Sequence, residues 1–150
     1  MTSKPGREAR GPRGLARQRA MQALYQWQVT GQAAADILRQ FTGDEEHGRC
    51  DGDYFRALVE GAIDQREALD GVIGDYSDRA LAQLDPVEHG ILMIGVYELM
   101  ERVEVPYRVV INEAVTLCRT FGAEDGHKFV NALLDRAARR LRSPEVEACG

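Results

Sequence analysis

The sequence predicts an all-α fold in which about seven helices form two antiparallel helical bundles that share one core. The first observation behind this prediction is that apolar residues recur at spacings of three and four along almost the whole chain. The second is that neither the alternating apolar and polar runs typical of strands nor internal repeats occur. The third is that proline and glycine stand at the borders of the apolar stretches, where they are typical start and stop signals of helices.

The N-terminal bundle is expected to span about residues 13–78. Its first helix, residues 13–29, and a short second helix, residues 33–41, each end shortly before a glycine that suits a C-terminal cap. Residues 44–53 are acidic, contain glycine and lack periodicity, so we expect a surface loop there. Two further helices follow, and their predicted core positions are Phe55, Leu58, Val59 and Ile63 in one and Leu69, Val72, Ile73 and Tyr76 in the other.

The C-terminal bundle is expected to span about residues 79–142 and to contain the central helix of the fold. Asp85 and Pro86 begin this helix, because aspartate is a good N-cap and proline is tolerated in the first helical turn. Apolar residues then cover most of the circumference, so we expect burial on all sides. These residues are Val87, Ile91, Leu92, Ile94, Val96, Leu99 and Met100.

Two more helices complete the predicted bundle. Pro106 starts the first of them, and Gly122 ends it. The last helix covers about residues 125–141. The face opposite its apolar stripe is mostly basic and is formed by Lys128, Asp135, Arg139 and Arg142. Residues 143–150 are expected to be a frayed, flexible tail.

The positive charge of the chain is concentrated at its N-terminus. Residues 1–20 carry six basic side chains against one acidic one, a net charge of +5, so the remaining 130 residues carry −10 of the total of −5. We therefore expect residues 1–12 to form a flexible basic arm ahead of a helical domain at residues 13–142. Such an arm is typical of a tail that binds nucleic acid or a membrane surface, and a solvated, disordered terminus is the alternative. The basic residues are Lys4, Arg7, Arg10, Arg13, Arg17 and Arg19.

Several classes of function find no support in the sequence. No apolar segment is long enough to span a bilayer or is placed like a secretory signal, so we expect a cytoplasmic protein; an organellar transit peptide is the alternative for the arginine-rich start. Cys50, Cys118 and Cys149 share no CxxC spacing, so neither a disulfide framework nor a metal site is predicted. The motifs of common nucleotide-binding, hydrolase and zinc enzymes are missing, so we predict a protein that is not an enzyme and has no cofactor.

Two elements have the chemistry to contact RNA. Arg13 and Arg17 extend the apolar stripe of the first helix toward its start, so we expect their guanidinium groups to reach solvent. Arginine binds phosphate with two hydrogen bonds and stacks on bases, which suits single-stranded RNA. At the start of the last helix, the free backbone N–H groups favour a phosphate, and Lys128 adds a positive charge beside them. Phe129 offers a surface on which a base can stack. The alternative for Phe129 is a place in the core, because it also fits the apolar stripe.

Several segments together resemble the NusB family of transcription antitermination factors, and the resemblance spans nearly the whole chain. In the N-terminal half it rests on Ala16-Arg17, Ala20, Gln22-Ala23-Leu24-Tyr25, Tyr54-Phe55, Leu58 and Gly61. In the C-terminal half it begins with Val87-Glu88, Tyr97-Glu98-Leu99 and Val105-Pro106-Tyr107. The longest block comprises Ile111-Asn112-Glu113-Ala114, Phe121-Gly122-Ala123-Glu124-Asp125 and His127-Lys128-Phe129-Val130-Asn131.

The resemblance implies a fold of two helical bundles without catalytic activity that binds boxA, a single-stranded element of ribosomal RNA leader transcripts. It also implies a heterodimer with NusE, a protein of the small ribosomal subunit, that holds boxA RNA at the elongating RNA polymerase and promotes read-through. The residues that match the family's RNA surface are Arg17, Gln22, Lys128 and Phe129, to which we add Arg7, Arg10 and Arg13 of the basic N-terminus. The residues that match its NusE-facing surface are Tyr25, Glu88 and Asp125.

The chain departs from the resemblance at one point, and other functions stay open. Gly14 and Leu15 stand where many relatives have a denser basic cluster, so a weaker grip on phosphate is expected there. One alternative is a purely protein-binding helical adaptor whose acidic body docks a basic partner. Another is a NusB-like domain acting in ribosomal RNA maturation, since such bundles also occur fused to RNA methyltransferases. The helical pattern does not decide whether a homodimer hides the arginine surface.

Overall fold

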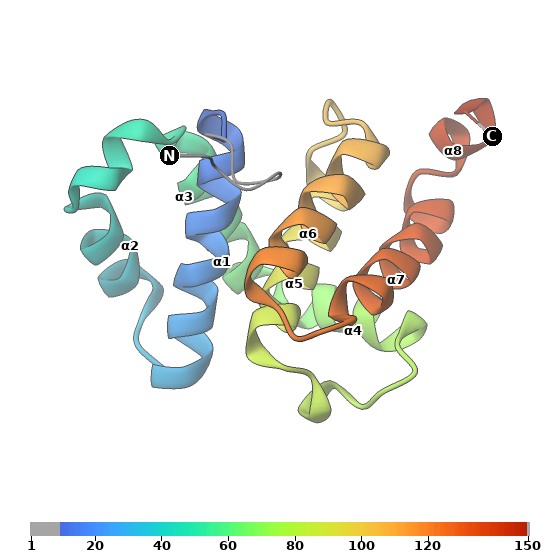
Figure 1. The fold of residues 1–150 in the computed structure, drawn as a ribbon, viewed down its shortest axis with the longest axis horizontal. Coiled ribbons are helices and arrows are strands. Elements are labelled where there is room, and N and C mark those ends of the chain that lie inside the picture. Colours follow the sequence, from blue (N-terminus) through green and yellow to red (C-terminus); the bar gives the residue numbers. More distant parts are fainter. Residues whose placement is uncertain (1–9, 150) are drawn as a thin grey trace.

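The computed structural model describes residues 10–149, and within that range it contains helices but no strand, which confirms the all-α prediction (Figure 1). The α-helices are α1 (Pro12–Thr30), α2 (Ala34–Thr42), α3 (Gly52–Asp64), α4 (Arg66–Tyr76), α5 (Pro86–Glu101), α6 (Tyr107–Phe121), α7 (Gly126–Leu141) and α8 (Ser143–Cys149). Two short 3₁₀-helices, η1 (Glu45–Arg49) and η2 (Leu81–Gln83), lie in the connections before α3 and α5.

The helices form two groups that meet at α5. Helix α1 packs against α2, α3 and α5, whereas α6 and α7 pack against each other and against α5. Figure 1 shows α1, α2 and α3 on one side of the view and α6, α7 and α8 on the other. Helix α4 contacts α5 and α7 as well as α3, so it ties the two groups together. The border near residue 78 between the two bundles stays a prediction.

Helix α5 is the central helix that the sequence predicts. Its N-cap is Asp85, whose Oδ1 accepts a hydrogen bond from the backbone N–H of Val87 at 2.7 Å, and Pro86 occupies the first turn. Every residue from 90 to 99 is buried, because α1, α3, α4, α6 and α7 all pack around it. One of these buried residues is the carboxylate Glu98, and its partners are central to the site described below.

The acidic segment between α2 and α3 lies at the surface, as predicted, and Arg19 fastens it to α1. No residue of η1 is buried. The guanidinium of Arg19 is almost fully covered and donates to Asp44 at 2.6 Å and to Glu46 at 3.0 Å. One of the six cations of the basic N-terminus is therefore neutralised inside the fold.

The C-terminal tail was expected to be frayed, and this expectation is wrong for residues 143–149, which form helix α8. Glu145 anchors α8, because its carboxylate accepts from the backbone N–H of Tyr107 at 2.8 Å and from Arg142 at 2.7 Å. Arg142 was expected on the exposed basic face of the last helix, but it is buried. Its guanidinium donates to the backbone carbonyls at the end of α5 and beyond it, namely those of Glu98, Leu99, Arg102 and Val105.

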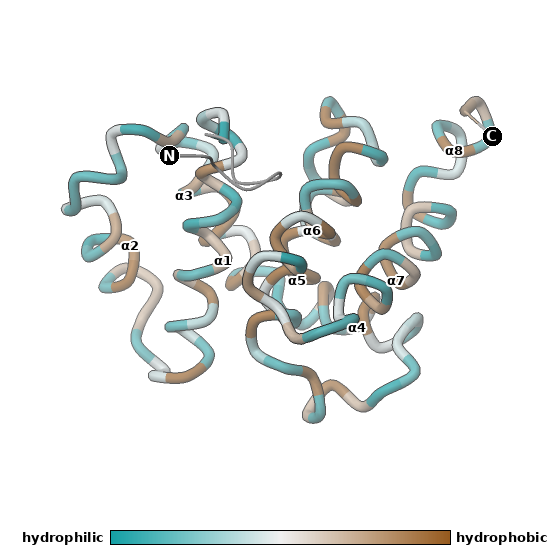
Figure 2. The backbone as a smooth tube through the Cα atoms, viewed as in Figure 1, coloured by the Kyte–Doolittle hydropathy of each residue, from teal (hydrophilic) through white to brown (hydrophobic). Residues whose placement is uncertain are grey.

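Hydrophobic and hydrophilic residues recur in turn along the helices, as expected where one face of each helix is buried (Figure 2). The strongly hydrophobic α5 is the exception, because it is surrounded by other helices. Among the described helices, none combines the length and apolar character needed to cross a membrane.

Candidate nucleic-acid interface

The start of α1 holds two of the predicted RNA-binding arginines in different states. Arg10 donates from Nη2 to Glu113 Oε1 of α6 at 2.7 Å, and its side chain packs over Gly14. A Cβ atom at Gly14 would lie 2.9 Å from Arg10 Nε, so this glycine leaves room for the arginine. The side chain of Arg13 is 44% exposed, stacks over the Tyr54 ring at 4.2 Å and lies 3.8 Å from Asp51. Arg13 is therefore the more accessible cation, and Arg7 lies outside the described residues.

Arg17 was expected to reach solvent, and this expectation is wrong. Its side chain is 6% exposed, and Nε and Nη2 donate to the carboxylate of Glu98 at 2.9–3.2 Å. Its Nη1 donates to Glu113 at 3.1 Å. Burial alone would lower the pKa of Arg17, but the hydrogen bonds and charge of Glu98 outweigh this effect and raise it. Arg17 is thus a permanently charged structural residue that joins α1 to α5 and α6.

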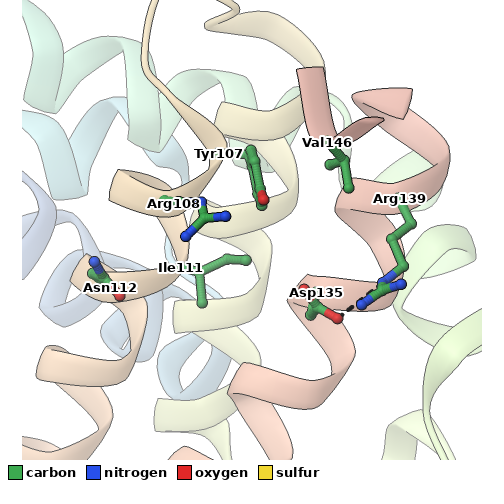
Figure 3. Close-up of a pocket in the computed structure, with 7 residues that line it drawn as sticks. All are labelled: Tyr107, Arg108, Ile111, Asn112, Asp135, Arg139 and Val146. Carbon is green, nitrogen blue, oxygen red and sulfur yellow. Dashed lines mark hydrogen bonds and ion pairs between the residues drawn. The ribbon is translucent and has the colours of Figure 1, made fainter. Parts of the chain in front are cut away.

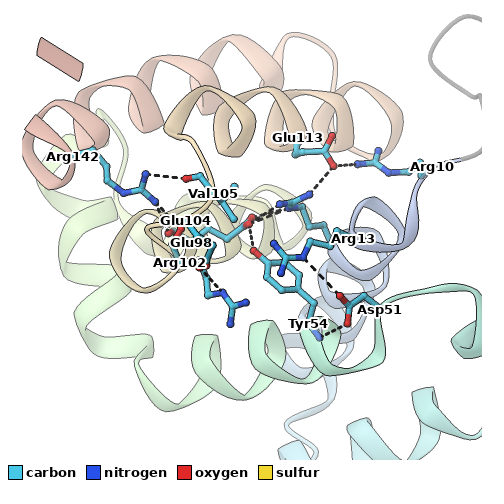
Figure 4. A network of polar contacts seen from close by, with 11 residues as sticks. Arg10, Arg13, Asp51, Tyr54, Glu98, Arg102, Glu104, Val105, Glu113 and Arg142 are labelled. Atoms are coloured by element: carbon cyan, nitrogen blue, oxygen red, sulfur yellow. Dashed lines mark hydrogen bonds and ion pairs between the residues drawn. The ribbon is translucent and has the colours of Figure 1, made fainter. Parts of the chain in front are cut away.

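Tyr54 of α3 completes this buried cluster (Figure 4). Its hydroxyl donates to the carboxylate of Glu98, and burial, followed by the negative charge of Glu98, raises the pKa of Tyr54 above its ordinary value. Arg13 and Arg102 lie over the Tyr54 ring, with 4.2 and 4.7 Å from guanidinium carbon to ring centroid. The cluster fixes the start of α1 against three other helices; it leaves Arg13 accessible, while Arg10 is 16% exposed and bound to Glu113.

The start of α7 carries the second predicted RNA element, and its two residues differ. Lys128 is 72% exposed, and its Nζ lies 3.3 Å from Asp125 Oδ1. Phe129 is half-buried, and the guanidinium carbon of Arg79 lies 4.0 Å from its ring centroid. One face of the Phe129 ring is therefore already covered, which leaves less of it for a base than the sequence analysis expected.

The remaining predicted residues are spread over two surfaces. Gln22 is half-buried on α1. Tyr25 is 43% exposed on the same helix and Asp125 is exposed before α7, where its backbone has a φ of 64°. Both are thus accessible to a partner.

Glu88 was expected to face a partner protein, but it is 2% exposed. Its Oε1 finds no hydrogen-bond partner among residues 10–149, and the nearest cation, Arg79, lies 3.8 Å away. A Cβ atom built on Gly126 would lie 2.5 Å from Glu88 Oε2, so the first residue of α7 closes over the carboxylate. Glu88 is buried because α7 begins directly above it, where the positive end of the helix dipole favours a negative charge.

The sequence analysis missed a polar groove between α6 and α7. One hollow of about 450 Å³ lies at the start of α6 (Figure 3), lined by Tyr107, Arg108, Ile111, Asn112, Asp135, Arg139 and Val146. A second hollow of about 550 Å³ lies at its end, lined by Asn112, Val115, Thr116, Arg119, His127, Lys128 and Asn131. The signal in the sequence was the spacing of Arg108, Asn112, Val115 and Arg119, which places all four on one stripe of a helix.

Lys128 connects this groove with the rest of the predicted site. It lines the second hollow and also a smaller one of about 240 Å³ that contains Phe129 and Arg79. At the other side, Glu113 follows Asn112 directly in α6 and binds Arg10. Arg10, just before α1, therefore reaches α6 one residue from Asn112, and Lys128 at the start of α7 lines the groove itself.

Known proteins similar to this chain support a single family assignment. A family model described as the NusB family matches residues 15–139. A transcription antitermination protein NusB from Pseudomonas savastanoi pv. phaseolicola is 46% identical over 133 residues, with 89% of this chain and 81% of the relative covered. Its counterpart from Xanthomonas campestris pv. campestris (strain B100) is 43% identical over 157 aligned positions, with 99% of both chains covered.

Solved structures agree in fold. NusB of Thermotoga maritima superposes with a TM-score of 0.75 at 27% identity, covering 87% of this chain and 93% of that one. A crystal structure described as antitermination factors NusB and NusE in complex with dsRNA gives a TM-score of 0.74 at 25% identity, covering 85% and 96%. On the family match and the identity to these relatives, the chain belongs to the NusB family of transcription antitermination proteins.

Proposed function

We propose that this protein binds single-stranded boxA-type RNA of ribosomal RNA transcripts together with NusE, and so promotes read-through by RNA polymerase in the cytoplasm. Membership of the NusB family supports this, as does a solved relative described as NusB and NusE in complex with dsRNA. The observation that carries the RNA part is that Arg13 and Lys128 are exposed cations, and that Lys128 lines a groove, on a chain whose residues after 20 have a net charge of −10.

Two of the residues proposed to contact RNA are chosen for their exposure, and the others come from the sequence and the family resemblance. Arg13 and Lys128 supply phosphate contacts, and Arg7 and Arg10 extend them along the arm. Gln22 and the free edge of Phe129 add hydrogen bonding and stacking. Arg17 is assigned to the fold, because its guanidinium is already bound on two sides by carboxylates.

Titration of fluorescently labelled boxA RNA, with and without NusE, at several salt concentrations tests the proposal. Each phosphate contact releases counterions, so affinity should fall steeply with salt. R13A should make the salt slope, the slope of log K against log salt concentration, shallower by about 1. R39A is the matched control, because Arg39 is exposed, ion-paired with Asp36 and located on α2. A salt-independent affinity, or equal binding of boxA and a scrambled sequence, would reject the proposal.

A purely protein-binding adaptor is the second candidate. It is favoured by the exposed apolar pair Tyr25 and Val29, one turn apart on α1, and by the engagement of Arg10 with a carboxylate of the fold. In both candidates Tyr25 and Asp125 face NusE, whose basic character would complement the acidic body. Y25A should weaken NusE binding about 10-fold by calorimetry. The adaptor is the correct choice if NusE binds with this sensitivity while RNA binding is undetectable.

A further inference from the structure

Two hollows follow one another between α6 and α7 and together form the groove. The hollow at the start of α6 includes Asp135 and Arg139 from the later half of α7, and the hollow at the end of α6 includes His127 and Asn131 from its earlier half. The two helices are therefore antiparallel neighbours, and Asn112 belongs to both hollows.

The charged side chains that line this groove are mainly positive, and two of its four lysine and arginine side chains form no ion pair within residues 10–149. Arg108 and Arg119 are exposed, and neither forms an ion pair with another residue of the described chain. Lys128 adds a third exposed cation. Asp135 is the one carboxylate among the residues that line the two hollows, and Arg139 neutralises it at 3.0 Å. A positive groove on a negative body attracts a polyanion and repels it from the surrounding surface.

The spacing of these groups suits an extended strand. Arg108 and Arg119 are eleven residues apart on one stripe of α6, about 16 Å at the helical rise. Asn112 lies between the two arginines on α6, Asn131 lies on the facing helix α7, and both are exposed. The primary amide of each offers donors and an acceptor to the edge of an unpaired base. Pairing occupies the Watson–Crick edges of the bases in a duplex, whereas in a single strand these edges are free to bind the amides.

We propose that the α6–α7 groove is a binding track for single-stranded RNA, in which Arg108 and Arg119 hold phosphates and Asn112 and Asn131 contact bases. This inference rests on the proposed function and assigns to it residues that the family resemblance did not supply. Arg10 reaches α6 near the middle of the track, because it binds Glu113 next to Asn112, and Lys128 lines the hollow at the end of α6.

Binding of labelled boxA RNA to the full chain tests the track directly. R108A and R119A should each make the salt slope shallower by about 1, and the double variant by about 2, whereas R39A should leave it unchanged. N131A should reduce the preference for boxA over a scrambled sequence about 10-fold with little change in salt slope. Circular dichroism should show the same helix content in all variants, since these side chains are exposed.

Two measurements separate failure of the track from failure of the proposed function. If R13A weakens RNA binding while R108A, R119A and N131A do not, RNA binding stands and the track is rejected. If the unaltered chain shows no salt-dependent RNA binding, both are rejected. Photocrosslinking with 4-thiouridine-containing boxA should label peptides of α6 and α7, and labels confined to other helices would overturn the track. Polyglutamate serves as a model of an acidic protein. If R108A and R119A lose binding to polyglutamate but keep their RNA binding, the groove is assigned to an acidic protein and the RNA track is rejected.

Discussion

Arg17 of α1 and Glu98 of α5 form a buried ion pair in which two guanidinium nitrogens donate to one carboxylate at 2.9–3.2 Å. The residues are 81 positions apart in the chain, so the pair fixes one helical group to the central helix of the other. Tyr54 and Glu113 complete it with a donor to Glu98 and a second acceptor for Arg17. The pair sets the direction of the start of α1, and thereby the place of Arg13.

Breaking this ion pair on one side should cost much stability. R17A leaves the carboxylate of Glu98 buried without its main counter-charge, so we expect a loss of about 3–5 kcal/mol in the free energy of unfolding, measured by urea denaturation. The double variant R17M/E98M removes both charges and should lose less than either single alanine variant. A loss below about 1 kcal/mol for R17A, combined with weaker RNA binding, would restore Arg17 to the RNA surface.

Tyr54 should make stability depend on alkaline pH. Its folded-state pKa is raised, first by burial and then by Glu98, so its contribution is complete below the unfolded tyrosine pKa of about 10 and is lost as pH rises above that value. Unfolding measured between pH 8 and 11 should show the chain losing up to about 1.4 kcal/mol per pH unit more than Y54F. Parallel curves for the two proteins above pH 10 would contradict the buried phenol.

Glu113 should act against RNA binding, because its carboxylate holds Arg10 beside the groove. E113Q removes one negative charge and releases Arg10 toward phosphate, so affinity for boxA should rise about threefold and the salt slope should steepen by up to about 1. E60Q is the matched control, since Glu60 is also ion-paired with an arginine, Arg56, within α3. Unchanged or weaker binding by E113Q, with E60Q neutral, would show that Arg10 has no part in phosphate binding.

The sequence predicted the elements better than the partners of individual side chains. Helix α5 could be predicted from Asp85, Pro86 and the apolar residues that follow them, because capping and periodicity are local properties of the sequence. Arg17 and Arg142 were misjudged as exposed, because periodicity gives the face of a helix but not the carboxylate or carbonyl groups that a distant segment brings to it. Glu88 was misjudged for the same reason, since the segment that covers it begins 38 positions later at Gly126.

Gly126 should be intolerant of even one added methyl group. A Cβ atom there would lie 2.5 Å from Glu88 Oε2 and 3.3 Å from Cys118 Sγ, so either α7 or a buried carboxylate must move. We expect G126A to lower the free energy of unfolding by about 1–3 kcal/mol. G71A is the matched control, because Gly71 lies within α4 with no atom near the position of a Cβ, and alanine should stabilise that helix by about 0.5–1 kcal/mol. Equal effects of the two substitutions in urea denaturation would mean that α7 does not begin tightly packed against Glu88.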